Sequence, residues 1–376
     1  LLRKIGFTLK TRPDLGLLMD RMKNARERRS IEHELESAFP EQKFTGQVHH
    51  VEHHLAHLSS AFHVSPYDEA AVISVDGFGD FSSAAWGIGR GTDISIDDRV
   101  YFPYSLGTFY QALTQFIGFP NYGDEYKVMG LAPYGEPVYM DEMRRIVLLR
   151  EDGSYRLNMD YFIYHVEKID YEWDNCAPSV GRLFSDQLAE LLGPPRQKGE
   201  ELTQRHRDIA RSVQAMYEEA FFHVLNRLHV RHGDDHLCIA GGCGMNSVAN
   251  GKVKRETPFR HVYIQSAAGD AGGAIGAAFV VHHRLNPQAG REFGMDHAYW
   301  GPAFDDMSIQ QTLDAKRLEL QQAGCTVERI DDKAVLCCKA AESVAEGRVI
   351  GWFQGRMEWG PRALGNRSII CDPRRG

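Results

Sequence analysis

Three short apolar runs in this sequence each lead directly into a loop of small residues. They occupy residues 70–75, 237–240 and 262–265. The first continues into Asp-Gly-Phe-Gly-Asp, the second into a Gly-Gly pair, and the third into a loop that places Asp270 before an Ala/Gly-rich helix. Short apolar runs bounded by glycine are typical of buried strands. Repeated units of strand, glycine loop and helix predict an α/β fold with functional groups at the strand ends.

The rest of the chain supplies helices and irregular segments. Apolar residues at helical spacing predict helices, and these are expected over residues 1–40, 106–117, 201–231 and 333–346. Residues 82–89 are expected to form the strand that returns from a turn. Segments without a clear period are expected to be loops or insertions: 76–80 as the turn, 121–135, 140–200 and 286–310. A change near residue 345, from helix to strand and arginine-rich loop, predicts a domain boundary.

Composition excludes several classes of protein. With a net charge of -8, the chain lacks the basic surface that a nucleic-acid-binding protein needs, so no nucleic-acid partner is expected. The longest apolar stretches are strand-sized, which predicts no membrane span. The seven cysteines show no C-x-x-C spacing, which indicates reduced thiols in a cytoplasmic protein. The chain opens on Leu-Leu and stops in a turn after a strand-like segment, so both ends are expected to be truncated.

Six histidines lie between residues 49 and 63, and two of them have the spacing of metal ligands. On a helix, His53 and His57 project from one face, one turn apart, within reach of a shared metal. A zinc protease of this spacing carries Glu after the first histidine, and here that position is His54. Two ordinary surface histidines are the competing interpretation.

Aspartates at the strand ends favour the metal site. Asp76 ends the first apolar run, and Asp270 begins the Ala/Gly-rich helix. The alternatives are a plain hairpin turn for Asp76 and a helix N-cap for Asp270, although Asp80 adds a carboxylate that a hairpin does not need. Two histidines with one or two aspartates make a mixed nitrogen and oxygen site. Such a site suits Fe(II), Mn(II) or Zn(II) better than a structural cysteine-type zinc.

Glycine loops at successive strand ends indicate a nucleotide site, because glycine lets a phosphate approach the backbone. Their spacing matches neither the P-loop nor the dinucleotide fingerprint. A rigid loop near the C-terminus carries arginines suited to phosphate or carboxylate, with a solvated turn as the alternative. The candidate cofactor-binding residues are Gly77, Gly79, Gly241, Gly242, Asn246, Gly269, Gly272, Arg356, Arg362 and Arg367.

Seven blocks of the chain, taken together, resemble the O-carbamoyltransferase family of nodulation and antibiotic-biosynthesis proteins. They are EHHLAHLSSAF, ISVDGFGD, SLGTFYQALTQFIGF, GDEYKVMGLAPYG, GGCGMNSVANGK, AAGDAGGAIGAA and GRMEWGPRALGNRSI. They follow the family order over nearly the whole chain. The resemblance implies a duplicated actin/sugar-kinase-like (RNase H-like) α/β domain over residues 1–345. It also implies the beginning of a YrdC-like α/β domain over residues 346–376.

The resemblance further implies an activity. In the family, the YrdC-like domain makes carbamoyl-adenylate from carbamoyl phosphate and ATP, and the larger domain passes the carbamoyl group to a hydroxyl of a sugar or natural product. Lys127 is implied as a contact to the acyl-adenylate. His54 is the candidate base, although its position next to His53 puts it off the ligand face. The implied ligands of the family's metal, typically iron, are His53, His57, Asp76 and Asp270.

Two other classes of function stay open. A hydrogenase-maturation carbamoyltransferase would carry zinc-finger C-x-x-C pairs, and a tRNA threonylcarbamoyl transferase subunit would lack the arginine-bearing extension. A metal- and nucleotide-binding module without catalysis is the second class. The partner expected for the O-carbamoyltransferase is a small-molecule or saccharide hydroxyl acceptor, and a homodimer is left open.

Overall fold

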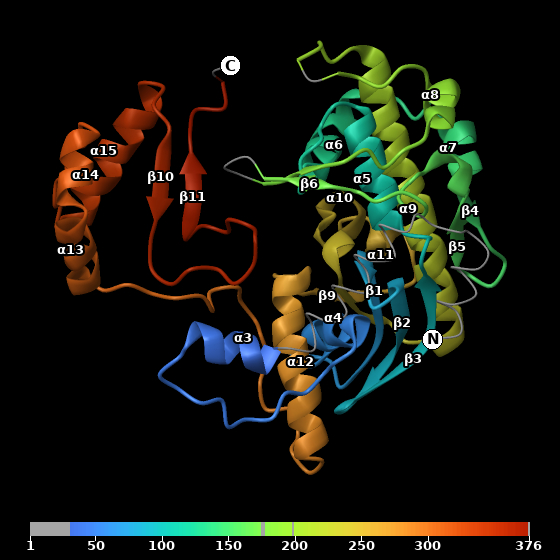
Figure 1. The fold of residues 1–376 in the computed structure, drawn as a ribbon, viewed down its shortest axis with the longest axis horizontal. Helices are drawn as coiled ribbons and strands as arrows, with labels where there is room; N and C mark the ends of the chain where they lie inside the picture. Colours follow the sequence, from blue (N-terminus) through green and yellow to red (C-terminus); the bar gives the residue numbers. More distant parts are fainter. Residues whose placement is uncertain (1–30, 174–176, 198, 375–376) are drawn as a thin grey trace. The chain divides into compact units, whose positions relative to one another are not determined.

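The computed structural model describes residues 31–173, 177–197 and 199–374 (Figure 1). The chain divides into two compact units, the first ending at Gly294 and the second running from Met295 to Gly376. The domain boundary predicted near residue 345 lies within the second unit, and the assignment of residues 1–345 and 346–376 to separate functional domains stays a prediction. Among the described helices, none combines the length and hydropathy that crossing a bilayer requires.

A five-stranded mixed sheet forms the centre of the first unit, in the order β3-β2-β1-β8-β9. Strands β1 (Glu69–Gly79), β2 (Ser82–Arg90) and β3 (Asp93–Tyr101) form an antiparallel meander. Strands β8 (His236–Ala240) and β9 (His261–Ile264) lie parallel to β1. The carboxyl ends of β1, β8 and β9 therefore meet at one edge, where α/β sheets bind ligands.

Helices cover both faces of this sheet (Figure 1). Side chains alternate between the faces of a strand, so Ile73 packs with α5 (Leu106–Phe116) and α9 (Gln204–His232), and Val72 packs with α4 (His53–Phe62). Helix α12 (Asp270–Leu285) lies beside α4. The layered arrangement confirms the predicted α/β fold, and the duplication implied by the resemblance stays a prediction.

Shorter elements complete the first unit. They are α3 (Ile31–Ala38), α6 (Glu125–Leu131), η1 (Ala132–Tyr134), α7 (Met140–Ile146), β4 (Val147–Leu149), β5 (Tyr155–Leu157), η2 (Met159–Tyr161), β6 (Tyr171–Glu172), β7 (Ser179–Val180), α8 (Asp186–Leu192), η3 (Gly242–Met245), α10 (Ser247–Asn250) and α11 (Val253–Glu256). The short pieces between α7 and α8 agree with the predicted irregular insertion.

The second unit contains three helices and one hairpin among its described residues. They are α13 (Asp306–Ala315), α14 (Arg317–Gln322), α15 (Lys333–Ala345), β10 (Ile350–Phe353) and β11 (Arg367–Ile370). The helix predicted over residues 333–346 is confirmed as α15. Of the helix predicted over residues 1–40, α3 is helical, and residues 1–30 lie outside the described residues.

The long helix α9 also confirms its prediction. A capping box formed by Thr203 and His206 begins it, and Gly233, with a φ of 68°, ends it. Only glycine adopts that left-handed conformation without steric cost, which is why helices often stop there. The predicted apolar stripe is buried along its length: Ile209, Val213, Met216, Ala220, Val224 and Leu228.

Three local predictions were wrong. The loop expected over residues 286–310 ends earlier, because α13 begins at Asp306. The turn expected over residues 76–80 is narrower, because β1 continues through an irregular stretch to Gly79 and pairs again with Ser82. The chain reverses at Asp80 and Phe81 instead. The expected loop over residues 121–135 contains α6 and η1. The glycines in this segment favoured a loop, but Glu125, Lys127 and Met129 between them are good helix formers.

Candidate metal centre

Helix α4 positions the two histidines. The side chain of Glu52 caps the helix by accepting a hydrogen bond from the backbone N–H of Leu55 at 2.8 Å, and it also pairs with Arg99 at 2.8 Å. His53 is the first residue of the helix, and His57 lies one turn later on the same face. The His57 side chain is 1% exposed and that of His53 is 26% exposed. His53 therefore lies at the solvent-exposed rim of the site and His57 at its buried floor.

Asp76 approaches both histidines from strand β1, just beyond the stretch that pairs with β8. Its Oδ2 atom lies 2.9 Å from His57 Nε2 and 3.1 Å from His53 Nε2, and the two Nε2 atoms are 3.0 Å apart. Its other oxygen accepts a hydrogen bond from the backbone N–H of Gly77 at 2.7 Å. The carboxylate is therefore fixed at both ends, with one oxygen directed at the histidines.

Asp270 reaches the same point from the first residue of α12. Its Oδ1 atom lies 3.4 Å from His57 Nε2 and 3.8 Å from His53 Nε2, and its side chain is 78% exposed. One ligand atom from each of the four residues lies within 4.8 Å of the others. Among the described residues, this is the one group of three or more such side chains with metal-binding geometry.

The donor set fits a divalent metal. With bonds of about 2.1 Å to nitrogen and oxygen, ligand atoms stand about 3.0 Å apart at right angles and about 3.4 Å apart at tetrahedral angles. The separations between the two histidines, and between each histidine and each aspartate, run from 2.9 to 3.8 Å, and all four ligand atoms lie within 4.8 Å of one another. Two neutral imidazoles and two carboxylates also suit the transition metals predicted from the sequence. His53, His57, Asp76 and Asp270 would hold the ion.

The histidines and aspartates of the cluster stabilise each other's charged forms. Burial lowers the pKa of His57, but hydrogen bonds to Asp270 and Asp76 outweigh it and raise that pKa to about 9. Burial raises the pKa of Asp76, but hydrogen bonds from His53 and His57 outweigh it and hold that pKa well below its usual range. A bound cation would replace the imidazolium charge beside the carboxylates, because metal and proton compete for the same nitrogen.

His54, the candidate base, points into the protein interior. Its Nδ1 atom hydrogen-bonds the Ser74 hydroxyl at 2.6 Å, and the residue is fully buried. Burial lowers the pKa of His54 to about 4, so the ring is neutral near pH 7. This placement favours a structural contact between α4 and β1 over proton transfer to a substrate.

The predicted nucleotide loops surround the cluster, and several of their glycines have packing reasons. A Cβ on Gly79 would lie 2.0 Å from the His53 ring, and one on Gly242 would lie 2.8 Å from Asp76 Oδ1. Gly241 has a φ of 87° and passes close to β1, while a Cβ on Gly272 would lie 2.2 Å from the Ala267 carbonyl oxygen. Gly77 faces open space, and Gly269 precedes α12. Nucleotide binding by these loops stays a prediction.

Two polar candidates have partners inside the protein. Asn246 exchanges hydrogen bonds with Gln214 at 3.1 and 3.2 Å and caps α10 through the N–H of Ala249. Lys127 pairs with Asp124 at 2.7 Å. Among the described residues, no recorded hydrogen bond or ion pair joins Lys127 to the metal cluster. Its contact to an acyl-adenylate stays a prediction.

The arginine loop of the second unit is organised around one buried glutamate. Glu358 accepts hydrogen bonds from the N–H groups of Leu364 and Asn366 at 2.7 and 2.9 Å and pairs with Arg367 at 2.8 Å. Arg356 donates to the Gly301 carbonyl at 2.7 Å. Arg356 and Arg367 therefore shape the loop, and phosphate recognition by Arg356, Arg362 and Arg367 stays a prediction.

The Glu358 carboxylate is expected to make this loop sensitive to acid. Burial raises the pKa of Glu358, but the Arg367 guanidinium and the backbone N–H groups outweigh it and lower that pKa from 4.5 to about 2. The stabilisation is complete above the unfolded pKa and is lost as pH falls from about 4.5 to about 2. We expect Glu358→Gln to flatten this dependence, measured as hydrogen exchange of the Leu364 and Asn366 amides. The surface variant Glu328→Gln serves as control, and an unchanged pH profile in Glu358→Gln would contradict the assignment.

A cavity of about 520 Å³ adjoins the metal cluster and is lined by His50, Glu52, Phe78, Asp80 and Gly273 in addition to ligand residues. His50 was not among the residues predicted to form the site, and no spacing rule would have placed it there.

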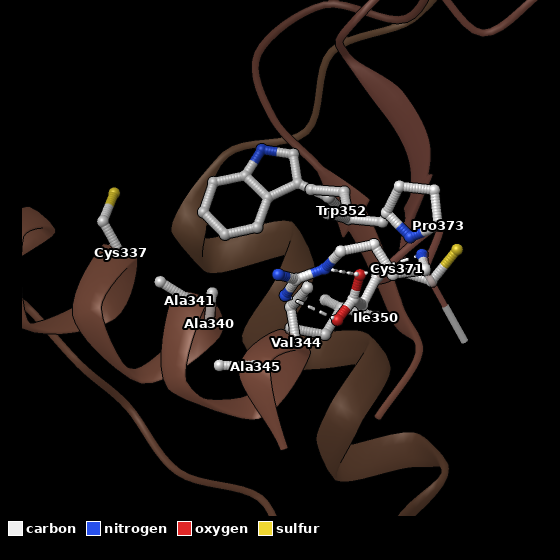
Figure 2. Close-up of a pocket in the computed structure, with 12 residues that line it drawn as sticks. Cys337, Ala340, Ala341, Val344, Ala345, Ile350, Trp352, Cys371 and Pro373 are labelled. Carbon is white, nitrogen blue, oxygen red and sulfur yellow. Dashed lines mark hydrogen bonds and ion pairs between the residues drawn. The ribbon is translucent and has the colours of Figure 1, made fainter. Parts of the chain in front are cut away.

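The other cavity, of about 590 Å³, lies within the second unit between α15 and the hairpin of β10 and β11 (Figure 2). Figure 2 shows Trp352 on one side and Ala340 and Val344 on the other, and the lining also includes the thiols of Cys337 and Cys371 and the ion pair of Asp372 with Arg374.

The fold and the cluster define an α/β protein with a His₂Asp₂ group at the carboxyl edge of its sheet. The chain belongs to the carbamoyltransferase family: the model "Carbamoyltransferase N-terminus" matches residues 23–279, and "Carbamoyltransferase C-terminus" matches residues 341–376. This membership confirms the family resemblance seen in the sequence.

Several known proteins are similar to this chain. An uncharacterized protein of Synechocystis is 42% identical over 86% of this chain and 50% of its own length. Nodulation protein NolO of Bradyrhizobium diazoefficiens is 38% identical over 86% of this chain and 53% of its own length. The chain spans about half the length of these curated relatives. A solved structure of T. kodakarensis HypF covers 65% of this chain and 38% of its own, at 16% identity and a TM-score of 0.34.

Proposed function

We propose that this chain contains the transfer site of an O-carbamoyltransferase. The carbamoyl group comes from carbamoyl phosphate, is activated with ATP as carbamoyl-adenylate, and passes to a hydroxyl of a sugar or natural product. The observation that carries the proposal is the His53, His57, Asp76 and Asp270 cluster at the sheet edge of a carbamoyltransferase-family chain. The divalent metal is proposed to be Fe(II), with Mn(II) or Zn(II) as alternatives, in a cytoplasmic protein.

The transfer step requires one bond to form and one to break. The acceptor oxygen forms a bond to the carbamoyl carbon, the bond from that carbon to the phosphate oxygen of AMP breaks, and the acceptor proton passes to a base. A metal held by the cluster would supply Lewis-acid polarisation or lower the pKa of the acceptor hydroxyl. The protein contributes orientation, since AMP is already a good leaving group and positioning is a large share of such a barrier.

The residues around the cluster have separate proposed tasks. Gly77 offers open space beside Asp76 in which a phosphate or carbamoyl oxygen fits. The cavity lined by His50, Phe78 and Gly273 is the proposed space for the acceptor. His50 is exposed and lines this cavity, so it is better placed than the buried His54 to take the acceptor proton.

The proposal predicts that the complete protein releases AMP only when carbamoyl phosphate, ATP and a suitable hydroxyl acceptor are all present. The measurement is AMP release together with mass spectrometry of the acceptor, using ¹³C-labelled carbamoyl phosphate and a panel of sugars. Omission of carbamoyl phosphate is the control. Binding of ATP and metal without labelled product across the panel would favour the binding module instead.

A further inference from the structure

Asp80 occupies an uncommon backbone position beside the metal cluster. It forms the turn between β1 and β2 with Phe81, and the two residues have φ values of 48° and 74°. Residues other than glycine rarely adopt positive φ, and a bulky aromatic does so least of all. Such a conformation persists where surrounding contacts hold it, often at functional sites. Asp80 also lines the cavity that adjoins the cluster.

The Asp80 carboxylate joins this turn to the helix that carries both histidines. Its Oδ2 atom accepts a hydrogen bond from the backbone N–H of His53 at 2.9 Å. His53 is the first residue of α4, and the first N–H groups of a helix have no partner within the helix. A carboxylate there is favoured by the helix dipole. Glu52 serves Leu55 in the same way, so two carboxylates fix the start of α4.

The same turn also contacts the His53 ring. A Cβ on Gly79 would lie 2.0 Å from Cγ and Cδ2 of His53, so the ring packs directly against the Gly79 backbone. The Nε2 atom of the same ring faces Asp76 Oδ2 at 3.1 Å. The segment from Asp76 to Asp80 therefore holds His53 at its backbone N–H, its ring face and its ligand nitrogen.

We propose that Asp80 is a positioning residue for the His53 ligand. By accepting the His53 N–H, it fastens the first turn of α4 to the β1–β2 turn and so keeps His53 Nε2 opposite Asp76. This inference rests on the proposed metal centre, because the role given to the hydrogen bond between Asp80 and His53 is to position a metal ligand. Asp80 itself need not touch metal or substrate.

Three substitutions separate the hydrogen bond from the backbone strain. Asp80→Gly removes the acceptor oxygen and relieves the positive φ, which glycine adopts freely. Asp80→Asn keeps an acceptor oxygen and also tolerates positive φ. Asp80→Ala removes the oxygen and keeps the strain. The matched control is Asp152→Ala in the β4–β5 turn, where the carboxylate likewise accepts a backbone N–H at 2.9 Å.

The first readout is hydrogen exchange of the amides in the first turn of α4, measured without metal. We expect exchange to accelerate about tenfold or more in Asp80→Gly and Asp80→Ala, because these amides lose their fastening. Asp80→Asn is expected to stay near the wild-type rate, and Asp152→Ala to leave α4 unaffected. The second readout is Co(II) affinity, followed by its visible absorption. Loss of a group that orients a ligand costs about 10- to 100-fold, with rescue in Asp80→Asn.

The outcomes are distinct. Wild-type exchange in Asp80→Gly, or equal damage in Asp80→Asn and Asp80→Gly, would overturn the positioning role. Faster exchange in Asp80→Gly with unchanged Co(II) affinity would also overturn it, since the contact would then be structural only. If the wild-type protein binds no Co(II), the proposed metal centre fails, whereas the exchange measurement still decides whether Asp80 fastens α4.

Discussion

Replacing His57 by alanine is expected to lower divalent-metal affinity by more than about 100-fold, a larger loss than removal of an orienting group produces. His57 is the buried ligand of the four, with 1% of its side chain exposed and contacts to both carboxylates. The adjacent His54 does not replace it, because its ring is turned toward Ser74. Labelled-product formation should fall with metal binding. Affinity is measured by competition with a chromophoric chelator at fixed pH.

The matched control for this variant is His49→Ala, which removes an exposed histidine from the same histidine-rich stretch of the sequence, outside the metal cluster. That variant should bind metal as the wild type does. Far-ultraviolet circular dichroism of both variants shows whether each is folded. If folded His57→Ala retained wild-type affinity, the cluster would not be the metal site, whatever the activity of the protein.

Gly276→Ala is expected to destabilise the first unit by about 1–3 kcal/mol or more, as overpacking of a tight interface does. A Cβ at Gly276 would lie 1.8 Å from the Ala56 carbonyl oxygen and 2.6 Å from the Ser60 nitrogen. Both contacts are backbone atoms of α4, which cannot rotate away. The helices α4 and α12 must then separate, and they carry the two histidines and Asp270. Metal affinity should therefore fall together with stability.

Gly273→Ala provides the comparison within the same helix. Apart from the backbone of its own helix and its chain neighbours, no atom lies within 4 Å of a Cβ at that position, so the expected effect on stability is the helix-forming advantage of alanine, about 0.5–1 kcal/mol. Urea denaturation of the two variants measures the difference. Equal midpoints for Gly276→Ala and Gly273→Ala would show that the close approach of α4 and α12 is not important for stability.

The sequence predicted those parts of the site that depend on local spacing or on the end of a strand. The spacing of His53 and His57 sufficed to place them together because helix geometry is fixed. Asp76 lies on β1 and Asp270 follows β9, two parallel strands of the sheet that are separated by β8, and the carboxyl ends of parallel strands share an edge. Metal binding itself follows from neither rule, since carboxylates and histidines also gather without an ion.

The failures arose where tertiary packing decides. The imidazole of His54 could act as a base. However, the direction in which it points depends on which face of α4 packs against β1, and the sequence does not show that face. The strand was expected to end at Asp76, but pairing with Ser82 extends it to Gly79. The positive φ values of Asp80 and Phe81 have no signal in the sequence, because neither residue is glycine.

The strand order has a consequence for how the protein is made. Strands β1, β2 and β3 are joined by short turns and can pair as soon as they leave the ribosome, whereas β8 reaches its place beside β1 only after the 29-residue helix α9 has been synthesised. Long-range parallel pairing is slow to form. Three ligand residues thus emerge early, while Asp270 arrives only with α12. The nascent chain therefore displays three of the four ligand residues beside an open strand edge, and exposed edges of this kind make an incomplete chain prone to aggregation.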